Sequence, residues 1–243
     1  MSEGERETKS YILVRKPAER TCYDVLMSLT DGHLCEIYGA YGTGKSRLVH
    51  HIAVEAQNAG KRVIYIDTEG GLTEQHARML KDYWYVGDEM DALEEAVAKA
   101  RDMREGYDLL VVDSVGHPVY VNYVELEGMQ DKLRAYQRLA MIFRDMVRFA
   151  RGERGKDLGS RRALAIATNH PVSEFARDEK DLPSEEPLDP FGGQIHRVPK
   201  LILRSEPAGT WFRLVAFKAR NLPRGVEVAR FRVADRVTVE WRI

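Results

Sequence analysis

The sequence is poor in cysteine, in long apolar runs and in excess charge of either sign. Its two cysteines, Cys22 and Cys35, are too few for a disulfide scaffold, and Cys35 is expected to be a small buried strand residue. No apolar run approaches the roughly 18 residues of a membrane span, and the charged N-terminus lacks the apolar core of a signal peptide. We therefore expect a cytoplasmic protein with no membrane partner.

The net charge is −1, although 31% of the residues are charged. A chain that is almost neutral has no overall field to attract nucleic acid, so such a partner would need a local basic patch. The 243 residues are 44% hydrophobic, enough for one domain with a substantial core. We predict a polar tail with a short strand over residues 1–20, and a single domain over residues 21–243.

The chain alternates apolar strand-like runs with helical patterns in its first two thirds and then contains only strand-like runs. Strands are predicted at 34–38, 62–66, 109–112 and 162–167, and helices at 45–58, 73–81, 88–104 and 129–150. Period-two alternation predicts antiparallel strands at 201–203, 211–217, 226–233 and 237–241. We predict an α/β fold with a central, mostly parallel twisted sheet flanked by helices, followed by C-terminal antiparallel strands.

A glycine-rich loop, Gly39-x-x-x-x-Gly44-Lys45-Ser46, stands between the first predicted strand and its helix. This is the spacing of a phosphate-binding loop, whose backbone N–H groups and helix N-terminus face an anion. Lys45 is expected to reach the β- and γ-phosphates of ATP, and the Ser46 hydroxyl to bind Mg²⁺. The predicted nucleotide-binding residues are Gly39, Ala40, Tyr41, Gly42, Thr43, Gly44, Lys45, Ser46 and Arg47.

Polar residues follow three further predicted strands. Asp113 ends an apolar run and would hold Mg²⁺, while Glu69 would be the general base toward the attacking water. Asn169 and His170 end the fourth strand, where a polar side chain could sense the γ-phosphate. The alternative for each is an ordinary solvated or capping residue at a strand end.

Several of these elements together resemble the RecA/RadA recombinase superfamily and, within it, the RadB branch. They are the run Asp67-Thr68-Glu69-Gly70, the glycine loop, Asp113-Ser114, Thr168-Asn169 and Phe191-Gly192-Gly193. The resemblance implies a RecA-type P-loop ATPase core that binds ATP at subunit interfaces, with Lys45, Glu69 and Asp113 as catalytic residues. It also implies that Lys218 and Arg220 act in the neighbour's ATP site, so a homo-oligomer is expected. From the sequence alone, both could simply be exposed strand ends.

The sequence departs from this superfamily in several ways, and two of them bear on nucleotide and DNA binding. The segment 72–78 does not identify the residue that would stack on adenine. The two segments expected to be DNA-binding loops are also unsuited to phosphate: 116–130 contains no Lys or Arg, and 172–190 has seven acidic residues against two basic ones. Positive charge gathers instead at Arg144, Arg148 and Arg151 and in the C-terminal segment from Lys200, which has ten Lys or Arg against four acids. Either set could contact a nucleic-acid backbone, or could be a solvated basic face.

Three functions are compatible with these observations. The first is an accessory ATPase of DNA repair and homologous recombination, with weak ATP hydrolysis and a recombinase or junction-processing partner. The second is a KaiC-like regulatory ATPase that does not act on DNA. The third is a binding module in which ATP stabilises an assembly and is hardly hydrolysed.

Overall fold

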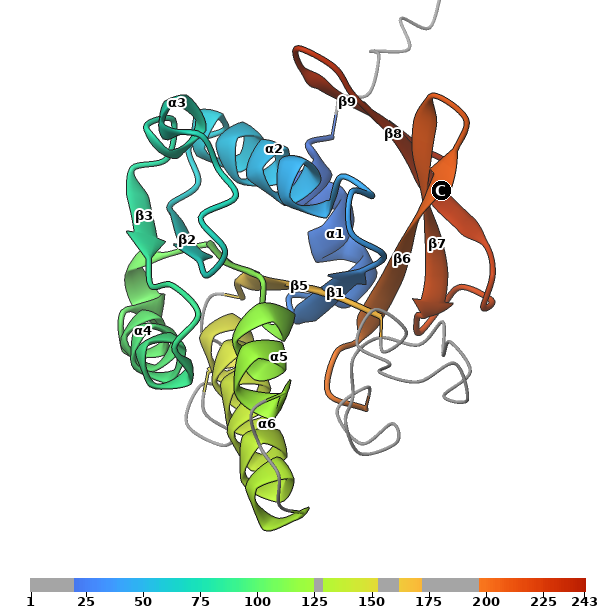
Figure 1. The fold of residues 1–243 in the computed structure, drawn as a ribbon. Coiled ribbons are helices and arrows are strands. Elements are labelled where there is room, and N and C mark those ends of the chain that lie inside the picture. The colour runs from blue at the N-terminus through green and yellow to red at the C-terminus, as the bar shows by residue number, and fades with distance from the viewer. Residues whose placement is uncertain (1–19, 125–128, 153–161, 172–196) are drawn as a thin grey trace, which may run out of the picture.

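The computed structural model describes residues 20–124, 129–152, 162–171 and 197–243. Their strands form one sheet in the order β3-β2-β4-β5-β1-β6-β7-β8-β9 (Figure 1). The strands are β1 Leu34–Tyr38, β2 Val63–Asp67, β3 Asp82–Tyr85, β4 Leu109–Asp113, β5 Leu164–Asn169, β6 Leu201–Ala208, β7 Trp211–Lys218, β8 Glu227–Val233 and β9 Val237–Trp241. Pairing is parallel from β3 to β6 and antiparallel from β6 to β9. The predicted fold class is therefore confirmed.

Helices cover both faces of the parallel part of the sheet (Figure 1). They are α1 Cys22–Thr30, α2 Lys45–Asn58, α3 Glu74–Ala77, α4 Met90–Asp102, α5 Gly116–Val124 and α6 Met129–Arg151. On one face α1 and α2 bury Leu26, Leu48 and Ile52 in a core shared with the C-terminal strands. On the other face α4 and α6 bury residues such as Leu93 and Phe143. Each core-facing stripe has helical spacing, which is why these segments form helices against the sheet.

Two sequence predictions are wrong. The helix predicted at 73–81 is only α3, capped by the Thr73 side chain, and the following run Asp82–Tyr85 pairs with β2 as an unpredicted edge strand. Aromatic residues favour a pleated, half-buried surface, and that preference exceeds the weak helical pattern there. The supposed loop at 116–130 is helical where it is described, because Ser114 Oγ accepts the His117 N–H and Val119 is buried.

Smaller shifts and gaps complete the comparison with the sequence. β5 begins at Leu164 and continues through Asn169, two residues later than predicted at each end. Cys35 is completely buried in β1, as expected. The tail with its short strand, the whole acidic segment 172–190 and residues 191–193 lie outside the described residues. In the part of the chain that is described, no helix is both long and apolar enough to cross a membrane.

The glycine loop is backed by the C-terminal half of the sheet. Ser205 Oγ in β6 donates to the Thr43 carbonyl at 2.8 Å. Gly44 has a φ of 77°, and a Cβ placed on it would lie 2.9 Å from the ring of Phe231 in β8. Phe231 is buried and stacks on Phe212, so its ring has little freedom to give way. The loop is therefore shaped by strands that are distant in sequence.

Two loop glycines provide a matched test of this packing. Gly42 and Gly44 both have positive φ, but a Cβ on Gly42 would have no neighbour within 4 Å. Each change to Ala is expected to cost about 1–2 kcal/mol for the left-handed backbone. Gly44→Ala should lower stability beyond that amount, because the Phe231 ring must also move. Urea denaturation of the two variants measures the difference, and equal losses would contradict the proposed packing.

Candidate functional site

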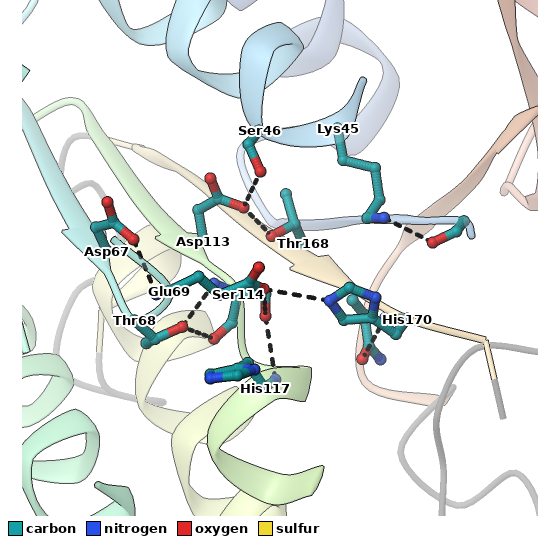
Figure 2. A network of polar contacts seen from close by, with 12 residues as sticks. Lys45, Ser46, Asp67, Thr68, Glu69, Asp113, Ser114, His117, Thr168 and His170 are labelled. Carbon is teal, nitrogen blue, oxygen red and sulfur yellow. Dashed lines mark hydrogen bonds and ion pairs between the residues drawn. The ribbon is translucent and has the colours of Figure 1, made fainter. Parts of the chain in front are cut away.

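The carboxyl ends of β1, β2, β4 and β5 meet at one edge of the sheet and bring the predicted site residues together. Because these strands are parallel, Asp67 lies opposite Asp113, and Tyr38, just before the loop, lies opposite Asn169. The first turn of α2 lies above this edge, with Ser46 pointing to Asp113 (Figure 2). Residues between 38 and 170 in the sequence therefore share one polar site.

Asp113 is the buried centre of the site. Its Oδ1 accepts hydrogen bonds from Ser46 Oγ, at 3.2 Å, and from the Thr168 hydroxyl, while its Oδ2 accepts from the Tyr65 hydroxyl at 2.6 Å. Burial raises the pKa of the carboxyl group, and the bonds from Thr168 and Tyr65 oppose that rise. A hydroxyl and a carboxylate side by side are hard oxygen donors of the kind that Mg²⁺ prefers, so this pair fits the predicted metal.

Glu69 carries a carboxylate held by two side-chain donors. Its Oε1 accepts from Ser114 Oγ at 2.5 Å and from His170 Nε2 at 3.2 Å (Figure 2). Partial burial raises its pKa, but the bonds from His170 and Ser114 outweigh that effect and lower the pKa to about 2. The side chain is 25% exposed. Glu69 is thus an ionised acceptor at neutral pH, open to the site and fixed in direction.

Side-chain bonds to the backbone at the ends of β2 and β4 fix the segments that carry Glu69 and Asp113. Asp67 Oδ1 accepts the N–H groups of Glu69, at 2.9 Å, and of Gly70, at 2.8 Å. Thr68 Oγ1 donates to the Ser114 carbonyl at 2.8 Å and accepts the Ser114 N–H at 2.9 Å. The peptide bond between Asp113 and Ser114 is cis. The two bonds between Thr68 and Ser114 tie the two strand ends directly to each other.

The glycine loop closes on itself in the described structure. Lys45 Nζ donates to the carbonyls of Gly39, at 2.6 Å, and Ala40, at 3.0 Å. Arg47 points instead toward α3, with Nη1 lying 2.6 Å from His76 Nε2. Tyr41 is 85% exposed at the tip of the loop. Lys45 thus contacts the backbone of the loop itself. The side chains of Tyr41 and Arg47 point away from it, toward solvent and toward α3.

The structure separates the two residues predicted to sense phosphate. His170 reaches Glu69, whereas Asn169 Nδ2 donates to Glu36 Oε1 in β1 at 2.7 Å and its Oδ1 accepts the His170 N–H at 2.8 Å. Asn169 therefore orients His170 and links β5 to β1. The sequence reasoning did not identify Tyr65 as a partner of Asp113. Its alternation within β2 gives no sign of which neighbouring strand its hydroxyl would meet.

The two residues predicted to act in a neighbouring subunit lie away from this chain's own loop. Lys218 pairs with Ile202, near the start of β6. Because β6 runs parallel to β1, its start lies at the end of the sheet opposite the glycine loop. Lys218 Nζ donates to the Pro199 carbonyl at 2.7 Å, and burial lowers its pKa. Arg220 follows β7 and is exposed.

The basic residues are partly neutralised. Arg148 and Arg101 both bond Asp145, whereas Arg144 and Arg151 are exposed on α6. In the C-terminal strands two glutamates each pair with two arginines: Glu206 with Arg204 and Arg213, and Glu227 with Arg230 and Arg242. The positive charge available to an outside partner is therefore smaller than the residue count indicates.

Comparison with known proteins agrees with this architecture. A family model described as an AAA domain matches residues 33–151. Protein RecA of Streptomyces rimosus is 33% identical over 141 residues, covering 53% of this chain and 35% of that protein. Protein RecA of Gluconobacter oxydans is 40% identical over 102 residues, covering 40% of this chain and 29% of that protein. The chain thus spans about a third of the length of these relatives.

A solved structure matches over a longer stretch. A crystal structure of the RadB recombinase superimposes with a TM-score of 0.60 at 22% identity, covering 90% of this chain and 97% of that one. At this identity the match establishes the fold. Together the comparisons confirm the resemblance to the RecA/RadA superfamily that the sequence motifs indicated, and the fold is that of the RadB structure.

Tyr65→Phe tests whether the hydroxyl bond keeps Asp113 ionised. Loss of the bond should raise the pKa of Asp113 further. When the pH is lowered, the variant should therefore lose Mg²⁺-dependent nucleotide binding at a higher pH than the wild type does. The buried carboxylate also loses a donor, which should cost about 1–3 kcal/mol of stability. Tyr83→Phe is the control, because its hydroxyl bonds Asp67 instead. Identical pH profiles for Tyr65→Phe and wild type would contradict this role.

Proposed function

We propose that this chain, which has the RecA/RadA fold and a glycine loop at the carboxyl edge of its sheet, binds ATP with Mg²⁺ and hydrolyses ATP slowly. One observation carries the proposal. Asp113 bonds Ser46 in the first turn of α2, next to Lys45, and Glu69 is held close to Asp113 by Ser114. One carboxylate meets the helix through a hydroxyl that can bind metal. The other is held beside it by Ser114, next in sequence to Asp113.

Nucleotide binding is assigned to residues 39–47. The backbone N–H groups of the loop and the first turn of α2 would surround the β-phosphate. Lys45 would exchange the carbonyls of Gly39 and Ala40 for phosphate oxygens, which are stronger partners for an ammonium group because they are charged. Ser46 and Asp113 would hold Mg²⁺, which neutralises phosphate charge when bound.

Glu69 is assigned as the general base. Its carboxylate would accept a proton from the water that attacks the γ-phosphorus, while Ser114 and His170 keep its orientation. General-base catalysis is most efficient when the pKa lies near the working pH. A pKa of about 2 makes Glu69 a weak base, and this supports slow turnover.

The biological output that these features favour is an accessory role in DNA repair and homologous recombination. The likeness to RecA and to RadB supports this reading. Exposed Arg144 and Arg151 would contact the DNA backbone, and Arg220, with Lys218, would complete a neighbour's ATP site in a homo-oligomer. A recombinase or a junction-processing protein is the expected protein partner. The acidity of the segment 172–190 favours the second candidate, a KaiC-like regulatory ATPase that does not act on DNA.

Glu69→Gln tests the assignment of the base. Glutamine keeps an oxygen acceptor for Ser114 and His170, so the local structure and ATP affinity should be retained. It cannot accept a proton as the carboxylate does, so turnover should fall by about 10²–10⁴-fold. The measurements are phosphate release and the affinity for a fluorescent ATP analogue. Glu74→Gln, at an exposed glutamate paired with Arg78, is the control. Unchanged turnover in Glu69→Gln would refute the assignment.

A salt titration distinguishes the two candidate outputs. For the DNA-directed function, the logarithm of the affinity for single-stranded DNA should fall linearly with the logarithm of salt concentration. The double variant Arg144→Ala, Arg151→Ala should reduce the slope by about 0.7 for each lost phosphate contact. Arg78→Ala is the control, because that arginine is exposed and already paired with Glu74. No binding at low salt, with ATP hydrolysis intact, would favour the regulatory ATPase.

A further inference from the structure

A second cluster of metal-ligating side chains lies outside the nucleotide site. Cys22, His51 and Glu55 each offer one ligand atom, and these atoms all lie within 4.8 Å of one another. We propose that this cluster is a zinc site, with Cys22 Sγ, one imidazole nitrogen of His51 and one carboxylate oxygen of Glu55 as its three protein ligands. It uses none of the residues assigned to ATP or Mg²⁺.

Two helices build the cluster. His51 and Glu55 are four residues apart on α2, so their side chains lie one above the other on the same face. Cys22 is the first residue of α1, and its backbone N–H donates to Glu55 Oε2 at 2.6 Å. Tetrahedral zinc, with bonds of about 2.0–2.3 Å, holds its ligand atoms about 3.5 Å apart. The three ligand atoms, which all lie within 4.8 Å of one another, are thus close to the spacing that such an ion requires.

The start of α1 is fixed independently of any metal. Thr21 and Asp24 form a reciprocal capping box there, and Leu26 is completely buried against the sheet and α2. Cys22 itself is 4% exposed. The thiol is thus presented to α2 by a rigid turn, as a preorganised ligand requires.

The His51 imidazole is suited to a metal because other described side chains do not occupy its ring nitrogens. Among the described residues, no hydrogen bond is found for its ring. Burial lowers the pKa of His51, against an opposing effect of Glu55. A half-buried imidazole that has no hydrogen-bond partner among the described residues can turn a nitrogen toward an ion.

Trp241 in β9 supplies a donor beside the thiol. Its indole Nε1 is buried and makes no hydrogen bond within the described part of the chain. Burial, and then the Glu55 carboxylate, raise the pKa of the Cys22 thiol to about 12. The nearby Trp241 side chain lowers this pKa. A donor next to the sulfur would stabilise a metal-bound thiolate more than a neutral thiol. Metal binding would release the thiol proton to solvent as the sulfur–zinc bond forms.

The ligand set distinguishes this site from the Mg²⁺ site. Sulfur, nitrogen and oxygen together suit zinc, whereas Mg²⁺ takes oxygen donors. His51 lies five residues after Ser46, about 8 Å further along the α2 axis and on a different face. Three protein ligands leave a fourth position for water. A bound ion would join α1 to α2 beneath β9, bracing the helix that carries the glycine loop.

Cobalt(II) is the probe for this site, because thiolate coordination gives it a near-ultraviolet charge-transfer band. We expect the purified, metal-stripped full chain to bind one equivalent of Co²⁺ with this band, and Zn²⁺ to displace it. Cys22→Ser should abolish the band, and His51→Ala and Glu55→Gln should each weaken Co²⁺ binding by more than tenfold. Mg²⁺ in excess should not compete.

The other cysteine provides the matched control. Cys35→Ala changes a completely buried thiol in β1 and should keep the band. Circular dichroism and ATP-analogue binding check that each variant is folded, and the α2 variants keep the test decisive if Cys22→Ser is unstable. The proposal is overturned if the wild type shows no thiolate band with Co²⁺, or if the band persists in Cys22→Ser. Either outcome leaves the ATPase assignment intact, because no ligand is shared.

Discussion

The buried carboxylate of Asp113 is the interaction on which the rest of this site depends. A charge in a nearly closed environment is costly unless hydrogen bonds compensate it. Here the compensation comes from Tyr65 in β2, Thr168 in β5 and Ser46 in α2. Because each donor belongs to a different element, the hydrogen bonds that stabilise the Asp113 carboxylate also fix the positions of β2, β5 and α2 relative to β4. The residues proposed to bind Mg²⁺ are therefore held by the same bonds that fix the local architecture.

The same network gives Glu69 and Asp113 opposite shifts in pKa. Asp113 is enclosed, and its burial favours the protonated form, whereas Glu69 remains partly open and is kept ionised by His170 and Ser114. An enclosed acid suits a fixed ligand, and an open one suits a group that meets solvent. The neighbours of each carboxylate, more than its residue type, determine which task it can take.

The sequence predicted the parts of this protein that follow from local pattern and failed where distant contacts decide. The glycine loop, its helix and the acids at strand ends have fixed spacing, so their convergence follows from a parallel sheet. The strand Asp82–Tyr85 was missed because its pairing with β2 is not encoded in its own short pattern. Tyr65 and the turn of Asn169 toward Glu36 were not foreseen, since each depends on which strand lies alongside.

The support that β6 and β8 give to the glycine loop has a consequence for how the chain acquires its structure. Ser205, which holds the Thr43 carbonyl, comes 162 residues later in the sequence, and Phe231, behind Gly44, later still. During synthesis the loop leaves the ribosome long before either residue exists. Contacts of such long sequence separation form late and slowly. A nascent chain would therefore carry the complete nucleotide motif for some time before it has a nucleotide site.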